Sequence, residues 1–400
     1  MAPGVATAVV VLAGGTSRRF GRDKLDAEVD GVTLLDAALS DLPAGWDLVL
    51  VGPPRPTARP GTWVREEPAG GGPAAGMVTG LRHALERGAE RLAVVPADAP
   101  GAGAAATALL QLLTDEPRAA ALVGVDDEGR EQPLQLGLRR AAAEQLVATV
   151  GGGHGASARA LVAALVPAAR PVRLRPAAAF DIDTPAQLAA WNAQGSAAVQ
   201  AVLELVARRR RPAGEPVVVA VDGPSGAGKS TLAAALRLRT GATVVPGDDF
   251  LSVALATSEA AARDRLSDAE VAAAVFDWER LRTEALQPLA SGAPARYRAF
   301  DWSTLVTHPR LGPTRQLEPA ALVVLEGVYA ARPELSDLVS VSVLVRAGEA
   351  VRTARLGSRG DDPHWAALWA RGERHYFSDV LTPGTVDLVV TGDIGQVDGT

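Results

Sequence analysis

Two glycine-rich stretches, LAGGTSRRFGRDK at residues 12–24 and GPSGAGKST at residues 223–231, decide how this chain is expected to fold. Each follows a β-branched, apolar run, at residues 7–11 and 217–221. This pattern is typical of a strand, a tight glycine turn and then a helix, which presents backbone N–H groups and the positive end of the helix dipole to phosphate. Two such loops predict two nucleotide-using domains and two phosphate-transfer activities.

Length and composition bound the class of protein. Four hundred residues suggest roughly two to three domains, and a net charge of −6 supplies no field that would attract nucleic acid or anionic lipid. The absence of cysteine excludes disulfides, zinc–thiolate sites and thiol nucleophiles, and no apolar run is long enough for a membrane span. We expect a cytoplasmic protein that acts on small-molecule substrates, with neither nucleic acid nor a membrane as partner. The sequence does not set its oligomeric state.

The order of the predicted elements favours two α/β domains. Strand and helix patterns alternate over residues 5–192, which indicates a mostly parallel sheet covered by helices. We expect a Rossmann-like domain over residues 1–194, a linker helix over 195–215 and a P-loop domain with a parallel sheet over 216–400. In the first domain the predicted strands are 7–12, 47–51, 91–95 and 120–125, and the predicted helices are 34–42, 75–87 and 104–113.

The first loop carries the residue types that nucleotidyl transfer needs. Gly14 and Gly15 let the backbone approach a triphosphate without a clash from Cβ, and Arg19 and Lys24 bring two cations to the same phosphates. These charges suit attack on an α-phosphorus with pyrophosphate as the leaving group, because negative charge grows on the departing oxygens. The predicted nucleotide-binding residues are Leu12, Ala13, Gly14, Gly15 and Lys24.

This loop resembles the LAGGxSxRMGxDK signature of the molybdenum cofactor guanylyltransferase-like nucleotidyltransferases, with Phe20 in place of Met. Three weaker matches extend the resemblance over the first domain: GPAAG at 72–76, VPADAP at 95–100 and DIDTP at 181–185. The resemblance implies a nucleotidyltransferase domain that uses Mg²⁺ and GTP or CTP. It makes Arg19 and Lys24 catalytic residues and Asp98 a metal ligand.

The position of Asp98 supports the metal role, because the carboxyl ends of strands in open α/β sheets line the ligand crevice and carboxylate oxygens suit Mg²⁺. The alternative for Asp98 is a cap of the helix expected from Pro100. Asp183 is either a helix N-cap or a contact to the substrate or a second metal. Asp181 and Asp183 stand where the guanylyltransferases often carry Asn. The phosphorylated acceptor, molybdopterin-like or other, therefore stays open.

The second loop matches the full GxxxxGK[ST] pattern between a predicted strand and a predicted helix. In this pattern backbone amides hold the β-phosphate, Lys229 bridges the β- and γ-phosphates and the Ser230 hydroxyl binds Mg²⁺. A neighbouring strand ends at Asp248 and Asp249, so both carboxylates are expected at the same rim. A carboxylate there can accept the proton of an attacking hydroxyl, and a helix cap is the alternative. The predicted nucleotide-binding residues are Gly223, Ser225, Gly226, Ala227, Gly228, Lys229, Ser230 and Thr231.

Residues 215–393 resemble the uridine kinase-like P-loop kinases, with similarity also to pantothenate kinases. Asp248 precedes Phe250 by two residues, as in the DSFY or DGF element of that family. The resemblance therefore implies an ATP-dependent kinase in which Asp248 is the base, and it leaves the helix cap to Asp249.

Two further segments of the second domain, FDWE at 276–279 and RYRAFDW at 296–302, resemble the acceptor-binding segments of these kinases. The histidine that the family carries after the second segment is replaced by Leu305, which argues against a nucleoside acceptor. Trp278 and Trp302 either pack in the core or stack on the acceptor. The candidate substrate contacts are Asp277, Tyr297 and Asp301.

Two more features of the second domain fit phosphoryl transfer. Glu326 ends an apolar strand pattern, a position typical of a Mg²⁺-binding carboxylate. Arg352, Arg355 and Arg359 fall on one helix face, which is either solvated or part of a lid over the triphosphate that would make Arg355 and Arg359 catalytic. A different hypothesis makes this domain a P-loop adaptor that binds nucleotide and assists the transferase without phosphorylating anything.

Overall fold

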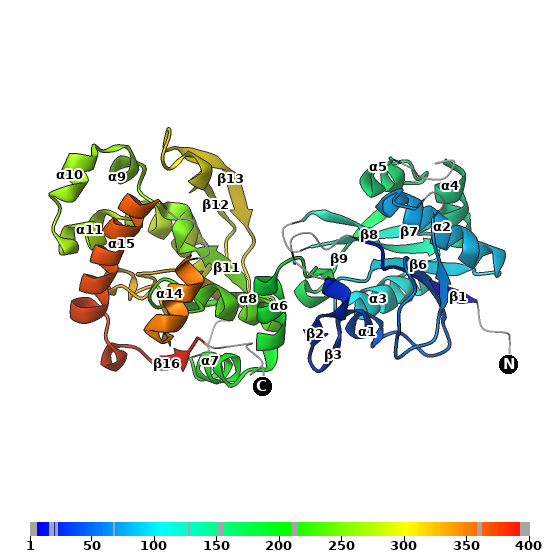
Figure 1. The fold of residues 1–400 in the computed structure, drawn as a ribbon, viewed down its shortest axis with the longest axis horizontal. Coiled ribbons are helices and arrows are strands. Elements are labelled where there is room, and N and C mark those ends of the chain that lie inside the picture. The colour runs from blue at the N-terminus through cyan, green and yellow to red at the C-terminus, as the bar shows by residue number, and fades with distance from the viewer. Residues whose placement is uncertain are drawn as a thin grey trace. The chain divides into compact units, whose positions relative to one another are not determined.

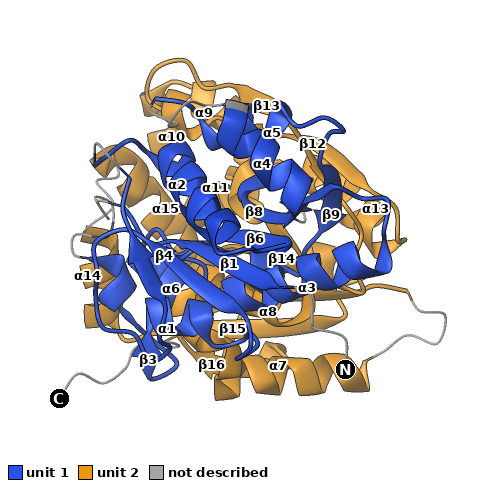
Figure 2. Cartoon of the chain, turned by 90° about the vertical axis from the view of Figure 1, so that its right-hand side faces the viewer, with its two compact units in different colours: residues 1–188 blue, residues 189–400 orange. Residues whose placement is uncertain are grey.

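The computed structural model describes residues 6–15, 20, 23–66, 69–126, 129–149, 155–209, 215–357 and 362–392. Arg19 and Arg359, both predicted to be catalytic, lie outside these residues. The contacts within the chain divide it into two compact units, residues 1–188 and 189–400, which Figure 2 colours separately. Each unit is mixed α/β, as predicted.

The first unit is built on a seven-stranded sheet of order β5-β4-β1-β6-β8-β7-β9. Its pairs are parallel except those of β8, which runs antiparallel to both β6 and β7. The predicted mostly parallel sheet is thus confirmed, and the antiparallel strand is an addition to it. The strands are β1 (Thr7–Leu12), β4 (Asp47–Val51), β5 (Thr62–Val64), β6 (Arg91–Pro96), β7 (Ala121–Val125), β8 (Glu131–Arg139) and β9 (Arg170–Arg173), with a small hairpin of β2 (Glu28–Val29) and β3 (Val32–Thr33).

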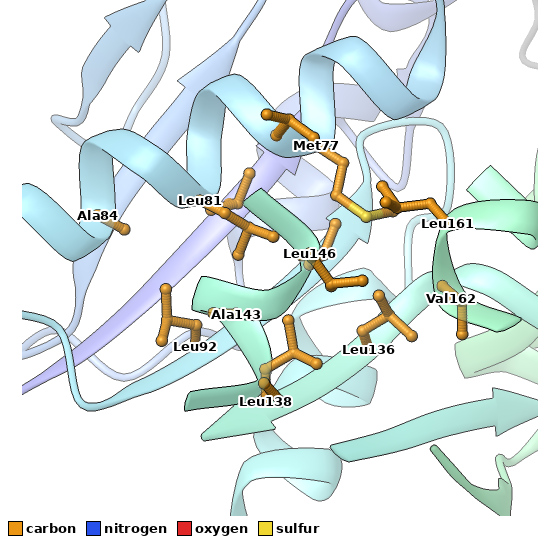
Figure 3. Close-up of a cluster of buried hydrophobic side chains, with 14 of the residues drawn as sticks. Met77, Leu81, Ala84, Leu92, Leu136, Leu138, Ala143, Leu146, Leu161 and Val162 are labelled. Atoms are coloured by element: carbon orange, nitrogen blue, oxygen red, sulfur yellow. The ribbon is translucent and has the colours of Figure 1, made fainter. Parts of the chain in front are cut away.

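The helices of the first unit cover this sheet and bury its apolar faces. One buried cluster joins α2 to α4, α5 and the strands beneath them (Figure 3). Met77 and Leu81 of α2, Leu136 of β8 and Leu146 of α4 are all at most 1% exposed in it. These helices are α1 (Leu34–Leu39), α2 (Pro73–Glu86), α3 (Ala102–Asp115), α4 (Arg140–Thr149) and α5 (Ala158–Ala163), and α6 (Pro185–Asn192) spans the division between the two units.

The second unit holds a five-stranded parallel sheet of order β11-β14-β10-β15-β16, whose edge strands β11 and β16 are labelled in Figure 1. Glu326 at the end of β14 pairs in register with Val221 of β10 and with Pro246 of β11. The carboxyl ends of these three strands therefore form one edge, as the P-loop pattern predicts. The strands are β10 (Val217–Asp222), β11 (Thr243–Pro246), β14 (Leu322–Glu326), β15 (Val341–Arg346) and β16 (Leu388–Thr391), and β12 (Ala295–Phe300) and β13 (Leu311–Leu317) form a separate antiparallel hairpin.

Helices of the second unit flank this sheet and extend beyond it. After β10 comes α8 (Lys229–Thr240), and α15 packs along α11. The helix predicted before the second domain is α7 (Ala197–Arg208), whose Val199 and Val202 are buried in the core beneath β10 and β14. The other helices are α9 (Val253–Thr257), α10 (Ala260–Asp264), α11 (Asp268–Ala274), α12 (Trp278–Arg280), α13 (Gln287–Ala290), α14 (Glu349–Gly357) and α15 (Pro363–His375), with π-helical turns at Leu281–Leu286 and Tyr376–Val380.

Candidate functional sites

The first phosphate loop leaves β1 between the ends of its two neighbouring strands. The Ala13 N–H donates to the Val51 carbonyl at 2.8 Å, and the Ala97 N–H donates to the Leu12 carbonyl at 3.1 Å. Gly52 has φ +148°, and a Cβ there would lie 2.8 Å from the Ala13 backbone. The backbone that follows, at residues 14 and 15, is exposed. It is therefore free to approach a ligand.

Three predicted site residues of the first unit meet at this edge. The Lys24 ammonium lies 2.7 Å from Asp98 Oδ2 and 2.6 Å from Asp183 Oδ1. Lys24 opens a short 3-10 helix, Asp98 follows β6, and Asp183 precedes α6. The chain thus brings together one cation and two carboxylates from segments far apart in the sequence.

The helix-capping alternatives fail for both carboxylates. The N-cap of α3 is Gly101, so Asp98 does not cap that helix. At the start of α6 it is the Thr184 hydroxyl that accepts the Gln187 N–H at 3.3 Å. Both carboxylates instead contact Lys24.

The electrostatics of this cluster are strongly coupled. Burial alone would lower the pKa of Lys24, but the carboxylates of Asp98 and Asp183 outweigh it and the pKa is raised. Asp181, which no role was predicted for, has its pKa raised to about 7 by burial and by the charges of Asp98 and Asp183. Its Oδ1 is buried and, among the described residues, has no hydrogen-bond partner.

The second phosphate loop has the geometry that its sequence pattern predicts. It links β10 to α8, and the Lys229 side chain is buried with its Nζ donating to the Pro224 carbonyl at 3.2 Å. The Ser230 hydroxyl donates to Glu326 Oε1 at 3.0 Å. A hydroxyl and a carboxylate side by side beside a P-loop are the donor set that Mg²⁺ prefers.

Two of the predicted arginines face this loop. Arg352 Nε donates to the Ser225 carbonyl at 2.9 Å, and Arg355 Nη1 donates to the Gly226 carbonyl at 3.1 Å. The purely solvated face is therefore the wrong interpretation for these two. Glu373 of α15 was missed by the sequence analysis: its Oε2 accepts the Ser225 N–H at 3.0 Å, and its Oε1 accepts the Ser225 hydroxyl. We call α14 and α15 the lid helices, after the lid role predicted for this segment.

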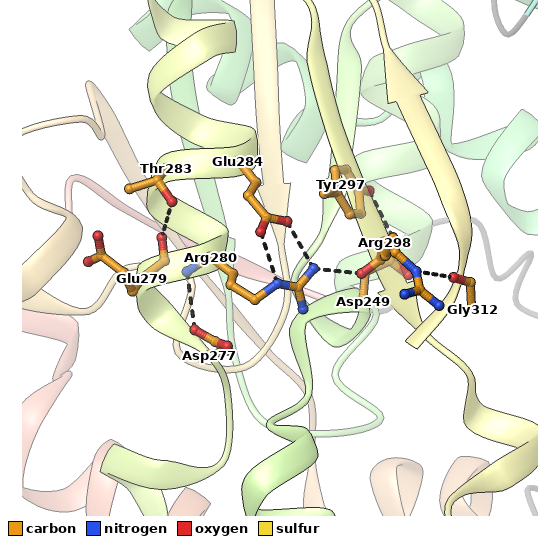
Figure 4. Close-up of polar contacts among 9 residues, drawn as sticks. All are labelled: Asp249, Asp277, Glu279, Arg280, Thr283, Glu284, Tyr297, Arg298 and Gly312. Atoms are coloured by element: carbon orange, nitrogen blue, oxygen red, sulfur yellow. Dashed lines mark hydrogen bonds and ion pairs between the residues drawn. The ribbon is translucent and has the colours of Figure 1, made fainter. Parts of the chain in front are cut away.

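The paired aspartates at the end of β11 differ sharply in environment. Asp248 is exposed, whereas Asp249 is buried. Asp249 accepts the Tyr297 hydroxyl at 2.8 Å (Figure 4) and also accepts Arg315 Nη1 at 2.8 Å. Burial raises the pKa of Asp249, although these two donors act against the shift. Asp249 ties the β12–β13 hairpin to the sheet, so its predicted helix-capping role is wrong.

The three candidate substrate contacts each have a partner within the fold. Asp277 caps α12 by accepting the Arg280 N–H at 3.1 Å, and Tyr297 is buried on Asp249. Asp301 accepts the Ser303 hydroxyl at 2.6 Å. These contacts do not gather the three side chains into one open cluster.

The two predicted tryptophans also differ from one another. Trp278 packs in an aromatic cluster with Phe276, Tyr329 and, over its ring at 3.8 Å, the Arg332 guanidinium. Trp302 is 41% exposed beside Trp369 of α15. The core interpretation thus holds for Trp278, and stacking on an acceptor stays a prediction for Trp302 alone.

Two absences among the described residues bound the chemistry. No group of three or more His, Cys, Asp or Glu side chains in them is placed to hold a metal ion. A bound Mg²⁺ would therefore draw most of its ligands from phosphate oxygens and water, as it commonly does. None of the helices in these ranges is long and apolar enough to cross a bilayer.

Fold and loop together define the class of each unit: a nucleotidyltransferase-like unit is followed by a P-loop kinase-like unit. Residues 9–169 match the family model for the MobA-like NTP transferase domain, and residues 218–360 match the model for the phosphoribulokinase / uridine kinase family. Both resemblances predicted from the sequence are confirmed.

The chain is also similar to curated proteins and to solved structures. The chain is 43% identical over 76 residues to the probable molybdenum cofactor guanylyltransferase of Deinococcus radiodurans, which covers 18% of this chain and 39% of that protein. It is 38% identical over 104 residues to the protein of the same description from Opitutus terrae, which covers 25% of this chain and 52% of that protein. The chain thus spans only 39% and 52% of the length of these two curated relatives. A solved structure, the putative fructose transport system kinase of Silicibacter sp. TM1040, is 26% identical and covers 48% of this chain and 98% of its own, with a TM-score of 0.36.

Proposed function

We propose that the chain is a bifunctional transferase. Its first unit transfers a nucleotidyl group from GTP or CTP to a phosphorylated small molecule, and its second unit transfers the γ-phosphate of ATP to the hydroxyl of a small molecule. The names of the two curated relatives support GTP and a molybdopterin-like acceptor for the first unit.

The contact of Lys24 with Asp98 and Asp183 carries the proposal for the first unit. Beside a bound triphosphate, the Lys24 ammonium would neutralise charge on the departing pyrophosphate. The oxygens of Asp98 and Asp183 fit Mg²⁺, and a bound Mg²⁺ supplies further positive charge at the phosphates. The chain's own contribution is to hold these three side chains together at the sheet edge from which the exposed loop leaves β1.

Replacement of Asp98 tests this proposal. Asp98→Ala should lower the rate of pyrophosphate release by at least about 10²-fold, as expected when a preorganised charge at the reacting phosphates is lost. A matched control is Asp47→Ala, because Asp47 is an exposed aspartate of the same sheet whose ion pair among the described residues is with Arg87. If Asp98→Ala releases pyrophosphate from GTP and CTP at the wild-type rate, the proposed transferase site is wrong.

For the second unit, the support is the position of Asp248 at the strand edge beside Lys229, Ser230 and Glu326. Asp248 is exposed, so an acceptor hydroxyl can reach it, whereas Asp249 is enclosed by its two donors. We infer that Asp248 takes the proton of the attacking hydroxyl while Lys229 and Arg355 hold the phosphates.

Asp248→Asn and Asp249→Asn separate the two carboxylates. Asp248→Asn should bind ATP and melt like the wild type but transfer phosphate about 10²–10⁴-fold more slowly, because it loses a general base. Asp249→Asn should chiefly lower stability. If Asp249→Asn alone abolishes acceptor-dependent turnover, the base is the other carboxylate. Slow nucleotide hydrolysis that no acceptor in a panel of nucleosides, vitamins and pterins stimulates would instead favour the adaptor hypothesis.

A further inference from the structure

Asp222, the last residue of β10, is fully buried and accepts four hydrogen bonds. Its Oδ1 accepts the N–H groups of Gly223 at 2.6 Å and Tyr329 at 3.1 Å. Its Oδ2 accepts the Ala331 N–H and the Tyr376 hydroxyl, both at 2.8 Å. The donors come from the start of the P-loop, from the loop after β14 and from the end of the lid helix α15. One carboxylate therefore joins three segments that surround the nucleotide site.

Only a carboxylate can make this set of contacts. An ionised carboxylate has about four lone-pair sites and no donor, so it can serve all four N–H and O–H groups at once. An asparagine would turn an amide N–H₂ toward two of them. The residue type at Asp222 thus follows from the four donors, which offset part of the cost of burying it.

The backbone and packing around Asp222 show that the contact to the lid helix is closely specified. Tyr329 has φ +69°, an uncommon conformation for a bulky residue, and its ring packs edge-on against that of Tyr376 with centroids 4.7 Å apart. A Cβ at Gly372 would lie 2.7 Å from the Tyr329 hydroxyl oxygen. Glycine at position 372 therefore allows α15 to pack this closely against Tyr329.

The same lid helix contacts the P-loop a second time, three residues earlier. Glu373 accepts the Ser225 N–H at 3.0 Å and the Ser225 hydroxyl, and Arg352 of the other lid helix donates to the Ser225 carbonyl at 2.9 Å. Asp222, which contacts Tyr376, thus holds Gly223 at one end of this P-loop segment, and Glu373 of α15 holds Ser225 at the other end.

We propose that Asp222 is a positioning residue that couples the lid helix α15 to the P-loop through the Tyr376 hydroxyl. The proposal rests on the nucleotide-binding role proposed for the second unit. When the end of α15 is bound to Asp222, Glu373 is kept at Ser225 and the P-loop amides are kept in one arrangement. Loss of the tie loosens the lid helix and, through it, the loop.

Tyr376→Phe removes the tie and leaves the ring packing intact, so the chain should fold. In the nucleotide-free protein, amide hydrogen exchange of the peptide 223–231 should become about tenfold faster, together with that of 363–376. The Kd for ATP or GTP, each with Mg²⁺, should rise about five- to tenfold, because a hydrogen bond to a buried charge is lost. Asp222→Asn should change both quantities in the same direction and by more.

The control is Asp379→Asn, which removes the negative charge from the exposed contact between His375 and Asp379 at 2.8 Å within the same segment. It should leave exchange over 223–231 unchanged. Wild-type exchange and Kd in Tyr376→Phe would overturn the proposal, as would an equal effect of Asp379→Asn. If neither nucleotide binds the wild-type chain, the proposed nucleotide-binding role fails, and the exchange of 223–231 still decides whether the lid helix and the loop are coupled.

Discussion

The Asp181 carboxylate, near the Lys24 cluster of the first unit, is buried with little to compensate the cost of burying its charge. Its Oδ1 has no partner among the described residues, and Asp98 and Asp183 add negative charge nearby. Lys24 lowers the pKa of Asp181, but not enough to offset burial. The folded protein therefore binds a proton at Asp181 up to a pH of about 7, which the unfolded chain releases near 3.8.

This shift predicts how stability depends on pH. Between pH 4 and 7 the folded state binds more protons at Asp181 than the unfolded state, so the free energy of unfolding should fall as pH rises through this window. Asp181→Asn should remove this dependence and be more stable than the wild type at pH 8 by roughly 1–4 kcal/mol. Urea unfolding at several pH values, with EDTA present, measures the difference. A variant that is less stable than the wild type at pH 8 would contradict the assignment.

The residues whose place in the fold could be predicted from the sequence are those that local motifs define. Lys24, Asp98, Ser230 and Glu326 each follow a strand or glycine-loop pattern, and the fold brings them to the expected edges. The residues that were missed depend on distant contacts. Glu373 reaches Ser225 across 148 positions, and no local pattern marks a glutamate inside a helix as a P-loop contact.

At the scale of elements, the approach of α2 to the sheet is set by a glycine in the middle of the helix. A Cβ at Gly80 would lie 2.8 Å from Val51 Cγ2 and closer still to Val10 Cγ1. Gly76, one turn earlier, faces the same strands with more space, because its Cβ would lie 3.4 Å from Val51 Cγ1. The two glycines provide a matched pair within a single helix.

Gly80→Ala should destabilise the first unit although alanine favours helix. Overpacking costs about 1–3 kcal/mol, which exceeds the gain of about 1 kcal/mol in helix propensity. Gly76→Ala should be close to neutral, since its contacts are near the ordinary range. Hydrogen exchange of peptides from α2, followed as a function of urea concentration, measures the stability of the first unit in both variants. Equal stability of the two variants would mean that α2 shifts freely on the sheet.

Helices and strands could be predicted from the sequence where one hydrophobic pattern dominates a segment, and less well elsewhere. The strands β1, β4, β6, β10 and β14 are apolar runs between turns, and all were predicted. The antiparallel β8 was not predicted, because its stretch EQPLQLGLR mixes polar and apolar residues and has a proline at its third position. Its place between β6 and β7 is decided by tertiary pairing rather than by local pattern.

At the scale of the whole molecule, α7 contributes to the second unit although it precedes the P-loop domain in the predicted division of the chain. Val199 and Val202 are at most 1% exposed, in one core with Val219 and Leu236. Arg209, just after the helix, contacts Asp387 at 2.9 Å. The contacts accordingly divide the chain between residues 188 and 189. A fragment that starts at residue 216 would leave an apolar face uncovered.

We therefore expect fragments 189–400 and 216–400 to differ in stability. Burial of a valine side chain contributes about 1.5–3 kcal/mol, so loss of α7 should lower the free energy of unfolding by about 3 kcal/mol or more. That is a large share of the roughly 5–15 kcal/mol that stabilises an ordinary domain. Urea unfolding of both fragments measures the difference, and Val199→Ala with Val202→Ala in fragment 189–400 should give an intermediate value. If fragment 216–400 unfolds at the same urea concentration as 189–400, α7 is a linker that contributes no stability to the second unit.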